Sequence, residues 1–247
     1  TNQTSNMASI SEKAQLMPAS AIRKLVPFAD AAKKQGVKVY HLNLGQPDIK
    51  SPACALDAVR NFSQENVSYS HSAGLMELRK GLVEKYYKKI GIDLTVDELI
   101  VTVAGSESVN LALEIACNPG DEVIVLEPFY TNYNTFAFMN GLTLKAIPTD
   151  IRNGFQIPPI EEFEKAITDK TKAILVCNPG NPTGTQYSKE SMLALGEIAR
   201  KHDLFLLSDE VYREFCYTDE PHFSAMNIPG LEQNVILIDS VSKRYNL

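Results

Sequence analysis

Residues 235–244 read Val-Ile-Leu-Ile-Asp-Ser-Val-Ser-Lys-Arg. The apolar run at 235–238 predicts a buried strand that delivers Lys243, with Ser240 and Ser242 beside it, to the strand's far end. Burial at such a place lowers the pKa of an amine and leaves it neutral and nucleophilic. A neutral amine can form a Schiff base with an aldehyde or another carbonyl. The alternative is an ordinary solvated lysine in a loop.

Apolar runs of the same kind alternate with helical patterns along the chain. We predict strands at 37–44, 99–103, 123–126, 142–147, 173–177, 204–207 and 235–238, and helices at 20–35, 52–64, 75–90, 109–117, 160–167 and 188–202. Continuous apolar strands that alternate with helices are typical of a mostly parallel sheet with helices on both faces. The predicted fold class is therefore α/β.

The unusual polar residues follow these predicted strands. Ligands of parallel α/β sheets bind beyond the carboxyl ends of the strands, so we expect these side chains to meet there. Each has a structural alternative: Ser106 as a helix cap, the aromatic residues as core, Gly45 as a plain turn. The residues in question are Gly105-Ser106-Glu107, Phe129-Tyr130, Asn181, Asp209 with Tyr212, and Ser240 with Lys243.

Together these residues supply hydrogen-bond donors for an anion, an aromatic ring for stacking, a carboxylate, a phenol, an amide and an amine. Pyridoxal 5′-phosphate needs all of these, because its phosphate, ring, pyridine nitrogen and aldehyde each require one of them. The glycine-rich motifs of dinucleotide and nucleoside triphosphate sites do not occur. The chemistry of the set therefore favours pyridoxal 5′-phosphate as the cofactor.

The composition narrows the function classes further. The chain has 247 residues and a formal net charge of −6, which argues against a nucleic-acid partner. No window is apolar enough for a membrane span. The four cysteines form no paired motif and predict free thiols in a reducing compartment, which favours the cytoplasm. The four histidines have no metal-ligand spacing, so no metal site is predicted.

Seven segments share their order and spacing with one enzyme family. They are 44–48 (Leu-Gly-Gln-Pro-Asp), Tyr69, 103–107 (Val-Ala-Gly-Ser-Glu), 119–123 (Pro-Gly-Asp-Glu-Val), 178–184 (Asn-Pro-Gly-Asn-Pro-Thr-Gly), 208–212 (Ser-Asp-Glu-Val-Tyr) and 240–243 (Ser-Val-Ser-Lys). In these segments the chain resembles the pyridoxal-phosphate-dependent aminotransferases of class I/II and fold type I, in the branch that contains aspartate and kynurenine aminotransferases. The resemblance extends from about residue 10 to the end of the chain.

The resemblance implies catalytic roles for three residues. Lys243 would hold the cofactor as an internal aldimine and then shuttle a proton at the substrate α-carbon. Asp209 would pair with the pyridine nitrogen and keep it protonated. Tyr212, together with Asn181, would bind the ring oxygen O3′.

It implies binding roles for others. Tyr130 would stack on the ring, with Phe129 as the second choice. The amides of Ser106 and Glu107 and the hydroxyl of Ser240 would bind the phosphate. In addition, Tyr69 would reach the phosphate of a neighbouring subunit in a homodimer with shared sites, and Gly45 and Asn181 would bind the substrate.

The resemblance also divides the chain into an arm with a small-domain segment at 1–45 and a cofactor-binding large domain at 46–247. The family's arginines for the phosphate and the substrate carboxylate would fall beyond Leu247. We therefore expect a fragment that aggregates or stays partly unfolded when expressed alone, because its strand edges lack neighbours.

The expected activity is transfer of an amino group between an L-amino acid and a 2-oxo acid. Two alternatives share the same cofactor site. One is a carbon–sulfur β-lyase or an amino-acid decarboxylase of the same fold, and the other is a non-catalytic regulatory module that binds the cofactor. Some members that act on acidic substrates carry a lysine where Ser106 stands, which weakens an aspartate assignment.

Overall fold

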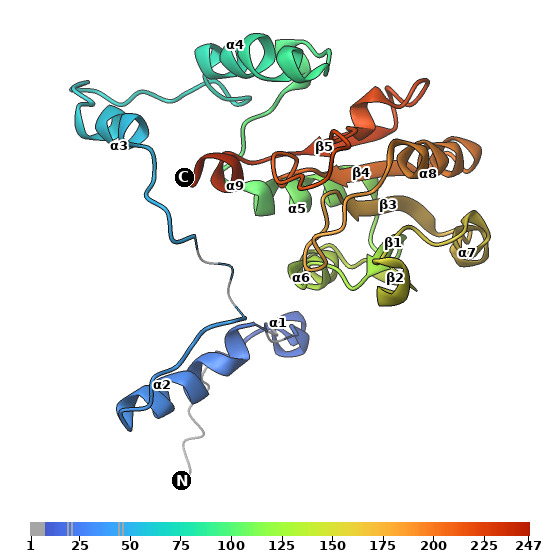
Figure 1. Ribbon diagram of the computed structural model, residues 1–247, viewed down its shortest axis with the longest axis horizontal. Coiled ribbons are helices and arrows are strands. Elements are labelled where there is room, and N and C mark those ends of the chain that lie inside the picture. Colours follow the sequence, from blue (N-terminus) through green and yellow to red (C-terminus); the bar gives the residue numbers. More distant parts are fainter. Residues whose placement is uncertain (1–7, 19, 21, 44, 46) are drawn as a thin grey trace.

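The centre of the molecule is a parallel sheet of five strands in the order β2-β1-β3-β4-β5 (Figure 1). The computed structural model describes residues 8–18, 20, 22–43, 45 and 47–247. All four strand pairs are parallel, as the apolar runs predict. The strands are β1 (Glu122–Glu127), β2 (Thr143–Pro148), β3 (Thr171–Cys177), β4 (Phe205–Asp209) and β5 (Val235–Ile238).

Helices cover both faces of this sheet, which confirms the predicted fold class. Successive side chains of a strand point to opposite faces. On β1, Ile124 and Leu126 pack in the cluster that includes residues of α7 (Ile160–Ala166) and α8 (Lys189–Lys201). The alternate positions Val123 and Val125 pack with residues of α5 (Gly105–Ala116) and α6 (Asn132–Met139). Each fully buried aliphatic side chain contributes about 1.5–3 kcal/mol relative to exposure.

The helix ends near the sheet differ from one another. Ser188 caps α8, with its Oγ accepting from the Ser191 amide at 3.2 Å. By contrast, α5 begins at Gly105, and Ala104 occupies its cap position without a side-chain hydrogen bond. The alternative in which Ser106 caps this helix is therefore wrong. Three α-helices of the described residues were not predicted: α1 (Glu12–Leu16), α6, and the five-residue α9 (Val241–Tyr245) after β5.

The described part of the chain before α5 contains several short helices and no strand. In Figure 1, α2 lies apart from the sheet, whereas α1 lies beside α6, where Lys13 Nζ donates a hydrogen bond to Met139 O. The elements are α1 (Glu12–Leu16), η1 (Arg23–Leu25), α2 (Val26–Lys34), α3 (Ala53–Arg60), α4 (Met76–Lys85), η2 (Tyr87–Ile90) and η3 (Val96–Glu98), and further along the chain η4 (Ile151–Asn153) and η5 (Ala225–Asn227).

Two predicted strands are wrong. Residues 37–43 and 99–103 have the apolar pattern of strands, but neither pairs with a strand among the described residues. A strand exists only where a neighbour accepts and donates its backbone hydrogen bonds. In the second segment, the Val101 amide donates to Ala73 O at 3.0 Å, which is a single loop contact. Leu44, the last residue of the first predicted strand, lies outside the described residues.

Three further findings concern the described part of the chain. No helix there is both long enough and apolar enough to cross a membrane. The cysteines are free thiols, with Cys117 buried and Cys54 exposed. No group of histidine, cysteine, aspartate and glutamate side chains in those residues has the geometry of a metal site.

Candidate active site

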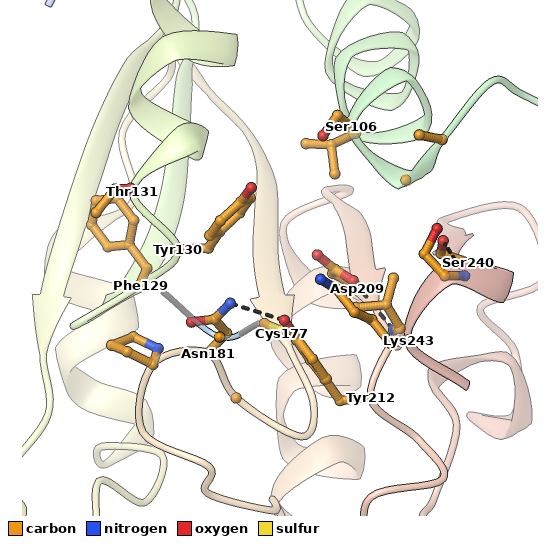
Figure 2. Close-up of a pocket in the computed structure, with 18 of the residues that line it drawn as sticks. Ser106, Phe129, Tyr130, Thr131, Cys177, Asn181, Asp209, Tyr212, Ser240 and Lys243 are labelled. Carbon is orange, nitrogen blue, oxygen red and sulfur yellow. Dashed lines mark hydrogen bonds between the residues drawn. The ribbon is translucent and has the colours of Figure 1, made fainter. Parts of the chain in front are cut away.

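One cavity of about 680 Å³ collects most of the predicted site residues (Figure 2). It lies at the carboxyl ends of the strands, where the loops after β1, β3, β4 and β5 converge. The predicted residues that line it are Gly45, Ser106, Tyr130, Asn181, Asp209, Tyr212, Ser240 and Lys243. Glu107 and Tyr69 are not among the lining residues.

Asp209, the last residue of β4, is buried at 6% exposure. Burial raises the pKa of its carboxyl group to about 6, against hydrogen bonds from Tyr133 and from the Val211 amide that lower it. Oδ2 accepts from the Tyr133 hydroxyl at 2.7 Å, and Oδ1 accepts from the Val211 amide at 3.3 Å. A carboxylate has about four lone-pair positions, so Asp209 can accept a further donor from the cavity.

Tyr133 is a site residue that the sequence reasoning missed. It lies in the first turn of α6 and is 1% exposed. The sequence-based predictions give it no role, yet its hydroxyl is the side-chain donor that holds Asp209. No local signal in the sequence identifies Tyr133, because its bond to Asp209 joins residues 76 positions apart.

Tyr212 and Asn181 form a hydrogen-bonded pair on the cavity wall. Asn181 Nδ2 donates to the Tyr212 hydroxyl oxygen at 3.0 Å, as Figure 2 shows. Because the amide is the donor, the phenol keeps its own proton available for another acceptor. Burial raises the pKa of Tyr212, so this phenol is protonated at neutral pH.

Two aromatic rings, Phe129 and Tyr130, follow β1 and line the cavity. In Figure 2 they lie across the cavity from Asp209 and Lys243. Phe129 is stacked on Tyr133 with an interplanar angle of 13°, whereas Tyr130 meets Tyr133 edge-on at 89°. The Tyr130 hydroxyl accepts from Asn132 Nδ2 at 2.7 Å, which orients its ring.

The N-terminus of α5 also faces the cavity through Gly105 and Ser106. Among the described residues, the structure records no hydrogen-bond acceptor for the amides of these two residues. Free amides at a helix N-terminus, together with the helix dipole, favour a bound anion. The Glu107 amide, in contrast, donates to Ala104 O at 3.0 Å, and its carboxylate accepts from the Val103 amide at 2.6 Å.

Ser240 and Lys243 follow β5. Ser240 caps α9, with its Oγ accepting from the Ser242 amide at 3.1 Å, which leaves its hydroxyl proton free to donate. Lys243 Nζ lies 6.0 Å from the centre of the Tyr212 ring. Lys243 is exposed, so the prediction of a buried amine is wrong. The reason is α9, which carries this residue beyond the end of β5 onto the cavity wall.

The remaining predicted residues, Tyr69 and Gly45, have no contact that explains their predicted roles in the described structure. Tyr69 is fully exposed and lies outside the cavity. A Cβ atom at Gly45 would meet no atom within 4 Å, so the structure gives no steric reason for glycine there. Gln46, which belongs to the same motif, lies outside the described residues. Five lining residues belong neither to the predicted site nor to the family segments: Ile22, Asn43, Val109, Thr131 and Cys177.

A family model described as aminotransferase class I and II matches residues 37–247. The chain belongs to this family. Among curated proteins it is 36% identical over 238 residues to a putative aminotransferase, YugH, of Bacillus subtilis, and 37% identical over 219 residues to an aspartate/prephenate aminotransferase of Thermus thermophilus. These alignments cover 96% and 88% of this chain but only 60% and 56% of the relatives. The chain therefore spans about three fifths of the length of these aminotransferases.

Solved structures of the family have the same fold. An aspartate aminotransferase of Thermus thermophilus, a single mutant, matches 97% of this chain and 62% of its own with a TM-score of 0.89 at 34% identity. An alanine aminotransferase of Pyrococcus furiosus matches 96% of this chain and 60% of its own with a TM-score of 0.84 at 33% identity. The structural similarity therefore extends to family members named for different amino acids, aspartate and alanine.

Proposed function

We propose that this protein is a pyridoxal-phosphate-dependent aminotransferase that moves an amino group between an L-amino acid and a 2-oxo acid. The observation that carries the proposal is the meeting of Lys243, Asp209 and the free amides of α5 in one cavity. Bound pyridoxal 5′-phosphate would supply an electron sink for the bond broken at the substrate α-carbon. The roles of the protein's own residues follow from their surroundings.

Asp209 fits the pyridine nitrogen of this cofactor. A buried carboxylate whose pKa is raised to about 6 gains from a cationic partner, and a protonated ring nitrogen is such a partner. The bonds from Tyr133 and Val211 would keep the carboxylate aimed at it. In this arrangement Asp209 holds the proton on the ring nitrogen, and Tyr133 acts through Asp209.

The part of the cavity where Gly105 of α5 lies beside Ser240 fits a phosphate. The amides of Gly105 and Ser106 and the hydroxyl of Ser240 would donate to it. The Glu107 amide already has an acceptor, so Gly105 replaces it in the proposal. Charge-assisted hydrogen bonds of this kind are roughly twice as strong as neutral ones.

The remaining residues would orient the ring and move the proton. The free phenol proton of Tyr212 would be donated to the ring oxygen, and Asn181 would hold that phenol. Tyr130 would cover one face of the ring. Lys243 would anchor the cofactor and, once released, take the proton from the substrate α-carbon. Gly45 and Asn181 would contact the substrate.

The wider setting belongs to the same proposal. A homodimer with shared sites is supported by the full exposure of Tyr69 and by other exposed apolar side chains before α5, such as Val67 at 81% and Leu42 at 95%. The cytoplasm is supported by the free thiols. A boundary between an arm at 1–45 and a large domain at 46–247 is supported by the separation of α2 from the sheet (Figure 1).

The test is attachment of the cofactor followed by turnover. The purified protein is incubated with pyridoxal 5′-phosphate and borohydride, and the modified peptide is identified by mass spectrometry. We expect label on Lys243, loss of label in Lys243→Ala, and normal label in Lys165→Ala, whose lysine is exposed and paired with Glu162.

Turnover distinguishes transfer from elimination. Amino acids are supplied with and without 2-oxoglutarate, and the products are analysed. Glutamate formed only when the acceptor is present supports an aminotransferase. Pyruvate and ammonia released without an acceptor would reject amino transfer in favour of a β-lyase.

A further inference from the structure

A second polar cluster lies next to Lys243 but outside the cavity. We call it the Asp239 cluster, and it consists of Tyr86, Tyr87, Arg213, Asp239 and Arg244. It joins the end of α4, the loop after β4 and the turn between β5 and α9. The side chains of Arg213, Asp239 and Arg244 are 3%, 9% and 5% exposed. Buried charges of this kind are costly unless they are paired and hydrogen-bonded.

Asp239 is the centre of the cluster. Its Oδ2 accepts from the Tyr87 hydroxyl at 2.8 Å and from Arg244 Nη2 at 2.9 Å. Its Oδ1 accepts from the Ser240 amide at 2.8 Å and lies 3.4 Å from Arg244 Nη1. The same carboxylate therefore holds the backbone of Ser240, which lines the cavity, and the side chain of Arg244, which follows Lys243.

Arg213 connects the cluster to the strand that carries Asp209. Its Nη2 lies 3.2 Å from Glu210 Oε2 and 3.9 Å from Asp239 Oδ2. Glu210 directly follows Asp209 and is fully buried. The ends of β4 and β5 are thus joined by charge as well as by the backbone ladder between them.

Arg244 has a second anchor in Tyr86. Its guanidinium carbon lies 3.9 Å from the centre of the Tyr86 ring, and Nη1 donates to the Tyr86 hydroxyl. That hydroxyl in turn donates to Glu214 Oε1 at 2.6 Å. The planar guanidinium can make a two-pronged ion pair and a stacked contact together, which a lysine ammonium cannot.

These contacts matter because α9 is short. A helix of five residues does not form on its own, so its orientation depends on tertiary contacts. Ser240 caps one end, and Arg244 is held near the other. Lys243 lies between these two anchors. A change in the Arg244 contacts would rotate or loosen the helix that points Lys243 into the cavity.

We propose that Arg244, through Asp239 and Tyr86, is a positioning residue for Lys243. The inference rests on the proposed function, because it assigns Arg244 a role in attaching the cofactor to Lys243. In this role the ion pair and the stacked ring set the direction of the Lys243 amine. The α5 amides proposed to bind the phosphate have no hydrogen bond to Arg244 in the described structure, and the Ser240 amide is held by Asp239 itself, so Arg244 governs attachment of the cofactor and not its initial binding.

The experiment separates attachment from binding. Cofactor-free protein is mixed with pyridoxal 5′-phosphate, the dissociation constant is measured by fluorescence titration, and the rate of attachment to Lys243 is measured by borohydride quenching and peptide mapping. A third measurement records acetylation of Lys243 in the cofactor-free protein as a function of pH. Melting temperatures of all variants report the fold.

For Arg244→Gln we expect attachment at saturating cofactor to slow by about tenfold, the size of one hydrogen bond to a charged group. The dissociation constant of the initial complex should stay within about twofold of the wild type, because the phosphate contacts are intact. Arg244→Lys should keep only part of the wild-type attachment rate. Tyr86→Phe, which keeps the ring, should keep most of that rate. Arg152→Gln removes an exposed arginine, 86% exposed and paired with Asp150, and should behave as wild type.

The outcomes are distinct. If wild-type protein attaches no cofactor at Lys243, the proposed function fails and this inference fails with it. If wild type attaches cofactor and Arg244→Gln does so at the same rate with the same acetylation profile, only the positioning role is overturned, whatever the change in melting temperature. If Arg244→Gln does not fold, Arg244→Lys gives the answer: slower attachment at an unchanged dissociation constant supports the proposal, and an unchanged rate overturns it.

Discussion

The hydroxyl of Tyr133 donates a 2.7 Å hydrogen bond to Oδ2 of Asp209. This bond joins the first turn of α6 to the end of β4 and is fully buried. It lowers the pKa of Asp209 against the larger effect of burial. The phenol stabilises the ionised form of the carboxylate. It therefore also strengthens the binding of a cation to that carboxylate.

Tyr133→Phe should therefore weaken cofactor binding. The variant keeps the ring in the core but removes the donor to Asp209, so the pKa of Asp209 rises further. We expect the dissociation constant for pyridoxal 5′-phosphate to increase by about ten- to a hundredfold, since a hydrogen bond to a charged group contributes about 1.5–3 kcal/mol. Tyr187→Phe is the matched control, because Tyr187 is buried in the core on the other face of the sheet. Equal affinities for the two variants would contradict the role of Tyr133.

Asp209→Asn should change how stability depends on pH in the cofactor-free protein. Burial raises the pKa of Asp209 to about 6 from the ordinary 3.8, so the folded protein binds this proton more tightly than the unfolded chain does. The wild type therefore loses stability as pH rises from about 4 to above 6. The variant does not titrate in this window.

Between about pH 4 and pH 7, the difference in unfolding free energy should move in favour of Asp209→Asn by on the order of 3 kcal/mol. Urea unfolding at both pH values measures it. Parallel stability profiles for wild type and variant would show that Asp209 titrates normally.

Gly196→Ala should destabilise the protein although alanine is the better helix former. A Cβ atom at this position of α8 would lie 2.6 Å from Ile228 Cγ2 and 3.0 Å from Leu231 Cδ1. Overpacking of this kind costs about 1–3 kcal/mol. Gly81→Ala in α4 is the control, because no atom lies within 4 Å of its Cβ position. That variant should gain about 0.5–1 kcal/mol. Thermal melts of both variants test the contrast, and stabilisation by Gly196→Ala would refute it.

Leu195→Ala should lower the unfolding free energy, because Leu195 packs in the core between α8 and the sheet. Leu195 is fully buried, and its truncation leaves a cavity against β3 and β4 residues of the same cluster. The expected loss in unfolding free energy is about 3 kcal/mol. Leu16→Ala, at a side chain that is 73% exposed, should change stability by less than about 0.5 kcal/mol. Similar losses for the two variants would contradict this packing.

The strands of the sheet could be predicted because their apolar runs are bounded by turn residues. The runs at 123–126, 173–177 and 235–238 all became strands. The run at 99–103 looks the same locally but has no strand beside it in the described structure. Pairing is a property of two segments, and a single-segment pattern cannot reveal it.

The candidate site could be predicted in part for a related reason. Asp209, Tyr212 and Asn181 follow predicted strands, so the rule for parallel sheets brought them together correctly. The resemblance implies a phosphate contact for the amides of both Ser106 and Glu107, yet helix geometry turns the Glu107 amide and carboxylate back onto residues before α5. A difference of one residue in helix phase was enough to separate them.

Local sequence patterns thus determined the parallel sheet and the identity of most side chains at its carboxyl edge, because burial and turn chemistry act over a few residues. Only the tertiary structure decided that Lys243 stands exposed on a short helix, that Tyr133 holds Asp209, and that Arg244 reaches Asp239 and Tyr86. Each of these depends on side chains from separate elements meeting at a given distance and angle, which only the packed fold can set.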